Sequence, residues 1–156
     1  MSNQTYFDAV DLDYLSEQLR DDAVAFTNPD LARDQGVQEQ IQHSLQPGNG
    51  IAVVDVANQP TGWARDVATK LQEATGLDTV IVQQPAGVSA VSDSWSRAEI
   101  EAAQAQTTPG QSQGDMLHTF YEALPAGDPA WGLIVPLVLA VCALAFWGAY
   151  RAANRR

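Results

Sequence analysis

The sequence predicts a small α/β sandwich domain followed by one C-terminal transmembrane helix, and two observations support this. Two short apolar runs rich in β-branched residues, at 51–56 and 79–82, flank a segment with the spacing of an amphipathic helix. Further along, the stretch from Trp131 to Tyr150 contains no charged residue. Twenty helical residues at about 1.5 Å each span roughly 30 Å, which matches the hydrocarbon core of a bilayer.

The first 50 residues predict two helices. Leucines recur at i, i+3 and i+7 and favour a helix from about Asp11 to Ala25. Asn28 and Pro29 are typical of an N-cap and a first helical turn, so we expect a second helix to begin there. This helix should end at Pro47-Gly48.

The middle of the chain predicts a strand, a crossover helix and a second strand. The apolar run at 51–56 precedes a helix at 63–75, which Gly76 should end in a left-handed conformation. The run at 79–82 then forms the second strand, parallel to the first. A turn at 84–87 should lead back into a third strand at 87–92.

The end of the domain predicts two shorter helices. Ser96 and Glu99 form a capping-box pattern, so a helix should run to about Gln106. A connector follows, and then a short helix at 115–124. We therefore expect this organisation: an α/β domain at 1–106, a linker with a short helix at 107–130, a transmembrane helix at 131–150 and a basic cytoplasmic tail at 151–156.

Charge is distributed unevenly along the chain. All 19 acidic residues precede the apolar stretch, together with only 5 of the 8 Lys and Arg residues; the remaining three are Arg151, Arg155 and Arg156. So acidic a domain disfavours nucleic acid and anionic lipid headgroups as partners.

The three C-terminal arginines also predict the orientation. The positive-inside rule places them in the cytoplasm and the acidic domain outside. The N-terminal residues have neither a basic nor an apolar region, so no signal peptide is expected. The alternative is a tail-anchored protein with its domain in the cytoplasm.

The apolar stretch contains the only cysteine, Cys142, so neither an intramolecular disulfide nor a zinc site built from cysteines is possible. Cys142, Ala145 and Ala149 follow helical spacing and form a stripe of small residues. Such a stripe allows close packing of a second transmembrane helix. The alternative is a plain anchor that faces lipid.

Sequence motifs for catalysis are weak. The segment Gly87 to Val91 differs from the nucleophile elbow G-x-S-x-G at its last position, where the sharp turn requires a small residue. His43 and His118 have no partner at metal-ligand spacing and are expected on the surface. The sequence therefore favours a protein that is not an enzyme and has no cofactor.

The order of elements resembles a known fold. The segments on which the resemblance rests are 50–55, 65–68, 75–82 and 97–101, and the C-terminal apolar stretch follows them. This layout resembles the TPM domain and, more closely, an uncharacterised actinobacterial family of small single-span membrane proteins with a TPM-like domain. The resemblance implies a TPM-like α/β sandwich at the membrane and does not imply an activity.

The same resemblance raises a metal-binding alternative, because some TPM domains are similar to metal-dependent phosphatases that use carboxylates near strand ends. Here Asp55 lies inside the first predicted strand, and Asp78 and Asp93 flank the later ones; the three would be the ligands of Ca²⁺ or Mg²⁺. They could do so only if their strand ends converge. For Asp55 the simpler interpretation is a carboxylate that pairs with Arg65 or a backbone amide.

The sequence thus supports three hypotheses of function. The first is a membrane-anchored accessory or scaffolding protein that binds envelope or membrane-complex proteins, a respiratory assembly being one host. The second is a metal-dependent phosphohydrolase of the TPM type. The third is a tail-anchored cytoplasmic adaptor, which differs from the first in topology.

Overall fold

The computed structural model describes residues 6–125. The predicted transmembrane helix at 131–150 and the stripe of Cys142, Ala145 and Ala149 lie outside the described residues. Within 6–125 none of the helices has the length and apolar character needed to cross a membrane.

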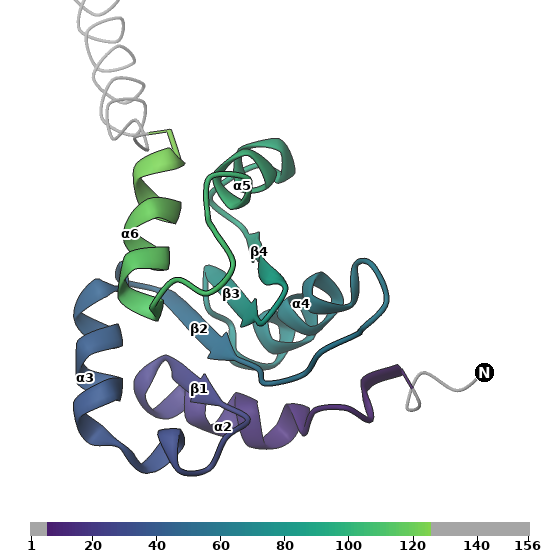
Figure 1. The fold of residues 1–156 in the computed structure, drawn as a ribbon, viewed down its shortest axis with the longest axis vertical. Coiled ribbons are helices and arrows are strands. Elements are labelled where there is room, and N and C mark those ends of the chain that lie inside the picture. The colour runs from purple at the N-terminus through teal and green to yellow at the C-terminus, as the bar shows by residue number, and fades with distance from the viewer. Residues whose placement is uncertain (1–5, 126–156) are drawn as a thin grey trace, which may run out of the picture. The chain divides into compact units, whose positions relative to one another are not determined.

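A four-stranded sheet forms the centre of the domain (Figure 1). Its strands lie in the order β1 (Val24–Phe26), β2 (Asn49–Val53), β3 (Thr79–Gln84) and β4 (Gly87–Ser92). The first three are parallel, with Ala25 opposite Ala52 and Ala52 opposite Val82. β4 runs antiparallel to β3, because only a two-residue turn joins them. This confirms the predicted strand–helix–strand unit with parallel strands and the turn back into a third strand.

Helices cover both faces of the sheet. α2 (Leu12–Asp22) and α4 (Trp63–Thr75) pack on one face, while α3 (Gln35–Ser44), α5 (Arg97–Gln104) and α6 (Gln113–Ala123) pack on the other. The alternation of side chains along each strand divides the core accordingly. Ala52 and Val82 contact the first pair of helices, and Ile51 and Ile81 contact the other three.

Local sequence explains several of these helices. The capping box of Ser96 and Glu99 is present at the start of α5, as predicted. Gly76 has φ +72° and ends α4, again as predicted. Trp63 begins α4 fully buried, and its indole N–H donates to the carbonyl of Tyr6 at 2.9 Å, which attaches the N-terminal segment to the core.

The first predicted helix is too long. α2 ends at Asp22, and Ala23 adopts a left-handed conformation with φ +64°. The residues from Val24 to Phe26 are then fully buried in the edge strand β1 rather than in a helix. Their apolar character fitted both structures, and pairing with β2 decides in favour of the strand.

The predicted start of the second helix is also wrong. Asn28 accepts a hydrogen bond from the N–H of Asp30 and makes a local turn, which a short 3₁₀ helix, η1 (Leu31–Arg33), follows. Asp34 is the actual N-cap of α3, because its carboxylate accepts from the N–H groups of Gly36 and Val37.

Candidate functional site: a cavity at the carboxyl ends of the parallel strands

A cavity of about 360 Å³ lies where β1, β2 and β3 end. Its wall includes the last residues of these strands, the residues directly after them, and the segment that precedes α6. Open α/β sheets bind their ligands at this edge, because the loops that follow the parallel strands can diverge there. We call this hollow the strand-end cavity.

Asp55 and Thr27 form one polar side of the strand-end cavity. The N–H of Asp55 donates to the Thr27 hydroxyl oxygen at 2.8 Å, and the Thr27 N–H donates to the Val53 carbonyl at 3.1 Å. These bonds fix the chain where it leaves β1 and β2. The Asp55 side chain is exposed, and its carboxylate accepts no hydrogen bond from residues 6–125.

Two glutamines at the end of β3, Gln83 and Gln84, also line the cavity. The Gln83 amide N–H donates to the Gln111 carbonyl at 3.2 Å and so attaches the segment before α6 to the sheet. The amide oxygens of Gln83 and Gln84 are both buried, and neither has a hydrogen-bond partner within the described residues. A buried acceptor without a partner costs about 1–3 kcal/mol, so these oxygens are unusual features of this end of β3.

Apolar side chains complete the cavity. Phe26 is buried, whereas Leu31 is 36% exposed and lies at the rim on η1. The other apolar members are Val53, Val54 and Pro85. A wall that combines apolar side chains with a few polar groups is the composition typical of ligand pockets.

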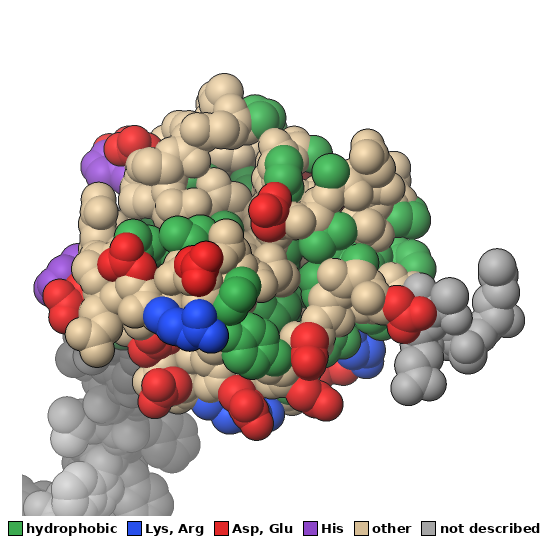
Figure 2. Space-filling view, turned by 60° about the horizontal axis from the view of Figure 1, so that its bottom comes forward, with side chains coloured by type: hydrophobic (Ala, Val, Ile, Leu, Met, Phe, Trp, Pro, Cys, Tyr) green, Lys and Arg blue, Asp and Glu red, His purple; other side chains and the backbone are tan. Residues whose placement is uncertain are grey.

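The electrostatic field of the domain is negative. In residues 6–125 every Lys or Arg already has a partner: Arg33 pairs with Asp30, Lys70 with Glu73, and Arg65 and Arg97 with Glu101, while Arg20 donates to the Ala74 carbonyl. Figure 2 shows acidic side chains scattered over one face of the domain with few basic ones. No Lys, Arg or His is among the residues of the strand-end cavity that the structure describes.

The groups with shifted pKa values lie outside this cavity. The hydrogen bond from Arg97 holds the pKa of Glu101 below its usual value. Burial raises the pKa of the Tyr121 hydroxyl, which accepts from the Asn49 amide at 3.0 Å. Catalytic acids and bases tend to be perturbed and to share a cleft. The perturbed groups of this domain instead serve local structure.

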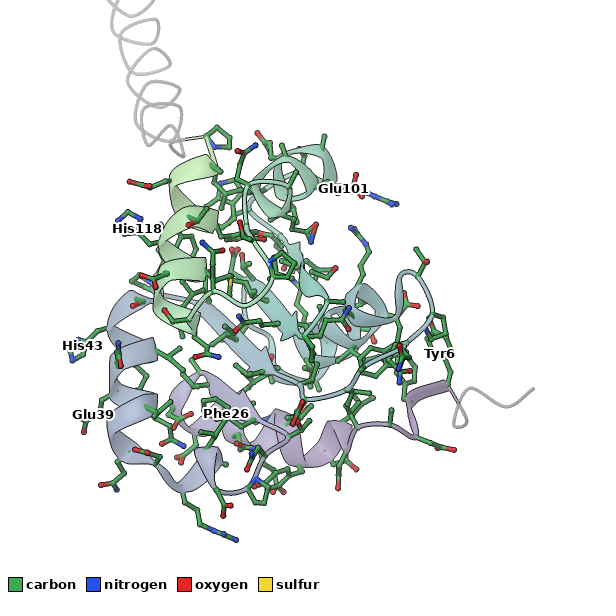
Figure 3. All side chains as sticks on the ribbon, viewed as in Figure 1. Tyr6, Phe26, Glu39, His43, Glu101 and His118 are labelled. Atoms are coloured by element: carbon green, nitrogen blue, oxygen red, sulfur yellow. The ribbon has the colours of Figure 1, made fainter. Side chains whose placement is uncertain are left out.

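A second hollow, of about 710 Å³, lies between α3 and α6 and includes His43 and His118. Figure 3 shows both side chains pointing away from the domain. His118 lies 3.2 Å from the Glu122 carboxylate one turn further along α6. Both histidines are exposed, which confirms the prediction that they are surface residues.

The three candidate metal ligands do not converge. Asp55 follows β2 at the carboxyl edge of the sheet, whereas Asp78 precedes β3 at the opposite edge. Asp93 follows β4, which is antiparallel, and therefore lies near Asp78; its N–H donates to the Asp78 carbonyl at 2.9 Å. Among residues 6–125 there is no group of three His, Cys, Asp or Glu side chains that could hold a metal.

Asp78 has a structural role that the sequence did not reveal, and Asp55 lacks the Arg65 partner that the sequence suggested. Both oxygens of Asp78 accept hydroxyl hydrogen bonds, from Thr79 at 3.0 Å and from Ser94 at 2.7 Å, and so fix the end of the β3–β4 pair. Asp55 does not pair with Arg65. The Arg65 guanidinium instead lies 3.8 Å from the Glu101 carboxylate. Asp55 is thereby left facing the strand-end cavity.

Sequence reasoning identified Asp55 as a site residue and missed Thr27, Gln83, Gln84 and Gln111. One available signal was the change from apolar to polar residues at Gln83, directly after a buried parallel strand. Thr27 gave no such signal, because the strand that precedes it was predicted as helix. Gln111 belongs to the site only because the segment before α6 lies against the end of β3, where the Gln111 carbonyl accepts from the Gln83 amide.

The family of the chain follows from residues 7–156, which match the family model described as membrane protein Rv1476. The chain belongs to this family. The match covers both the α/β domain and the apolar C-terminal stretch, and it agrees with the predicted kind of protein, a small actinobacterial-type membrane protein. No curated protein and no solved structure matches the Rv1476-family chain.

Proposed function

We propose that this Rv1476-family protein is a membrane-anchored, non-catalytic accessory or scaffolding protein. Its TPM-like α/β domain binds a segment of an envelope or membrane-complex protein, of which a respiratory assembly is one example. The strand-end cavity is the observation that supports this proposal. It has the volume, the position and the mixed polar and apolar wall of a binding site.

The chemistry of the cavity favours binding over catalysis. Its polar side chains are a hydroxyl and neutral amides, with Asp55 as the one carboxylate among the described wall residues. Nucleophilic catalysis by the Thr27 hydroxyl would need a general base within hydrogen-bond reach of it, and among the described residues this hydroxyl contacts only the backbone N–H of Asp55. Amides and hydroxyls instead recognise polypeptide and other polar groups without transforming them.

The placement of the domain is part of the proposal. The apolar stretch from Trp131 to Tyr150 anchors the chain, and the arginines that follow it favour a cytoplasmic tail with the α/β domain outside. The family match supports the association with a membrane and is neutral on the orientation. In this placement the cavity would face proteins of the cell envelope.

Site-specific photocrosslinking in intact membranes tests the proposed function. A benzophenone amino acid replaces Leu31 at the rim of the cavity, in the full-length chain. The matched control replaces Asp93, which is exposed at the opposite edge of the sheet. We expect discrete protein adducts from position 31 and not from position 93.

A competition step shows whether the adducts depend on the cavity. Gln84→Trp should fill part of the cavity and reduce the adducts from position 31. If position 31 yields only lipid adducts, or the same adducts as position 93, the protein does not use this cavity to bind proteins and the proposal fails.

A further inference from the structure

The charge of the strand-end cavity limits what can bind in it. Asp55 is the one carboxylate of the described wall, and no basic side chain of the wall balances it. Around it the domain carries 18 Asp and Glu residues against 5 Lys and Arg residues in 6–125, and each of the five already has a partner. An anionic ligand would therefore be repelled, and a cation would be attracted.

Hydrogen-bonding capacity points in the same direction. Asp55 is exposed and offers two carboxylate oxygens that accept nothing from the described residues. Both oxygens are acceptors. Lysine ammonium and arginine guanidinium groups are donors without acceptor atoms, so they complement such a carboxylate.

The apolar part of the wall suits the remainder of such a side chain. Leu31 and Pro85, which are both exposed, can contact a chain of methylene groups. Lys and Arg side chains bury their methylene stems against apolar surface while the charged end stays with polar groups.

We propose that the strand-end cavity binds the side chain of a Lys or Arg residue of the partner protein, with Asp55 as its counter-ion. This inference rests on the proposed function and names the chemistry that the partner must present. A single carboxylate favours a monovalent side chain over a free diamine, because the second ammonium group of a diamine would have no counter-ion in the wall.

Small probes of known charge test this with the full-length chain in an uncharged detergent. The probes are Nα-acetyl-lysine amide and Nα-acetyl-arginine amide, with Nα-acetyl-norleucine amide as the neutral analogue and cadaverine as the free diamine. Isothermal titration and thermal unfolding report binding. We expect the lysine or arginine probe to bind at least tenfold more tightly than the norleucine probe.

Two variants with the same change of charge separate a site from the general field of the domain. Asp55→Asn should lower the affinity for the cationic probe about tenfold or more, while Asp93→Asn at the opposite edge of the sheet should leave this affinity unchanged. An equal loss in both variants would mean that bulk charge attracts the probe, and the proposal would be overturned. Failure of every cationic probe at millimolar concentration, or tighter binding of cadaverine than of the lysine probe, would also overturn it.

The crosslinking experiment keeps this inference distinct from the proposed function. If position 31 still captures its protein adducts in an Asp55→Asn background, the cavity binds a partner without this ion pair. The proposed function would then stand and the cationic recognition would be wrong. If the adducts decrease in Asp55→Asn and persist in Asp93→Asn, both are supported.

Discussion

The side-chain amide of Gln18 pairs with both backbone groups of Phe26. Its N–H donates to the Phe26 carbonyl at 3.1 Å, and its oxygen accepts from the Phe26 N–H at 3.1 Å. One side chain of helix α2 thus supplies the two hydrogen bonds that a neighbouring strand would otherwise provide. Asp22 adds a third bond by accepting from the Val24 N–H at 3.1 Å. An unpaired edge strand invites pairing with another chain, and these two side chains cover the outer edge of β1.

Gln18→Ala should therefore destabilise the domain by about 1–3 kcal/mol, because it removes two hydrogen bonds from a partly buried backbone. Hydrogen exchange of the Phe26 amide should accelerate in the same variant. Glu17→Ala is the control: Glu17 is the exposed neighbour on α2, and its loss should change the free energy of unfolding by less than about 0.5 kcal/mol. Unchanged exchange at Phe26 would show that Gln18 does not protect the edge.

The same region shows where sequence reasoning reached its limit. Val24 and Ala25 continue the apolar pattern of α2, so periodicity alone extends the helix to about Ala25. Their strand structure depends on β2, which lies more than 20 residues further along, and on Gln18. By contrast, the limits of α4 and α5 are encoded locally, by Gly76 and by the Ser96–Glu99 capping box, and both could be predicted.

The candidate site was predictable to a smaller extent, for the same physical reason. Asp55 could be identified because the TPM resemblance pointed to carboxylates near strand ends, although it was placed inside a strand at 51–56, whereas β2 ends at Val53. The predicted metal site required Asp78 and Asp93 at the same edge of the sheet as Asp55, but these two residues flank strands at the opposite edge. Which residues meet Asp55 depends on strand order and direction, which residue spacing does not determine.

Gly50 should tolerate no side chain. A Cβ atom there would lie 2.6 Å from the Leu77 methyl carbon and 3.2 Å from the Ala23 carbonyl oxygen, between β2 and its neighbours. Gly50→Ala should cost about 1–3 kcal/mol through overpacking. Gly36→Ala is the matched control, because its Cβ would meet only Asp34 at 3.4 Å in the first turn of α3, and helical alanine stabilises by up to about 1 kcal/mol. Urea unfolding of both variants should give shifts of opposite sign.

The capping box of α5 predicts a pH dependence. Hydrogen bonds from the Ser96 side chain and backbone lower the pKa of Glu99. A lowered pKa in the folded state means that Glu99 stabilises the fold above its unfolded pKa, the ordinary value of 4.5, and that this stabilisation is lost as the pH falls through the folded pKa. Ser96→Ala should cost about 1 kcal/mol at pH 7, and the Glu99 titration measured by NMR should move up toward the ordinary value.

Ser112→Ala provides the comparison for this effect. Ser112 caps α6 in the same way, by accepting from the Asp115 N–H at 3.2 Å. Its loss should lower stability at pH 7 and leave the Glu99 titration where it is in the wild type. An unshifted Glu99 midpoint in Ser96→Ala would mean that the capping box does not control this carboxyl.

Divalent cations should not stabilise the domain through Asp55, Asp78 and Asp93. Hard cations need several oxygens at about 2.0–2.6 Å, and Asp55 lies at the opposite edge of the sheet from the other two. Thermal unfolding of the full-length chain should show the same midpoint with and without millimolar Ca²⁺, Mg²⁺ or Mn²⁺. A rise in the midpoint that Asp55→Asn and Asp78→Asn each abolish would instead support the metal-dependent phosphohydrolase hypothesis.

Membrane topology decides which proteins can reach the strand-end cavity. A single cysteine introduced at the exposed Ser94, with Cys142→Ser to remove the natural thiol, can be labelled by a membrane-impermeant maleimide in intact cells. The positive-inside rule applied to Arg151, Arg155 and Arg156 predicts labelling without lysis, because the domain would lie outside. A cysteine placed after Arg156 is the control and should be labelled only after lysis. The reverse pattern would identify a tail-anchored cytoplasmic adaptor, and the basic partner of Asp55 would then have to be sought among cytoplasmic proteins.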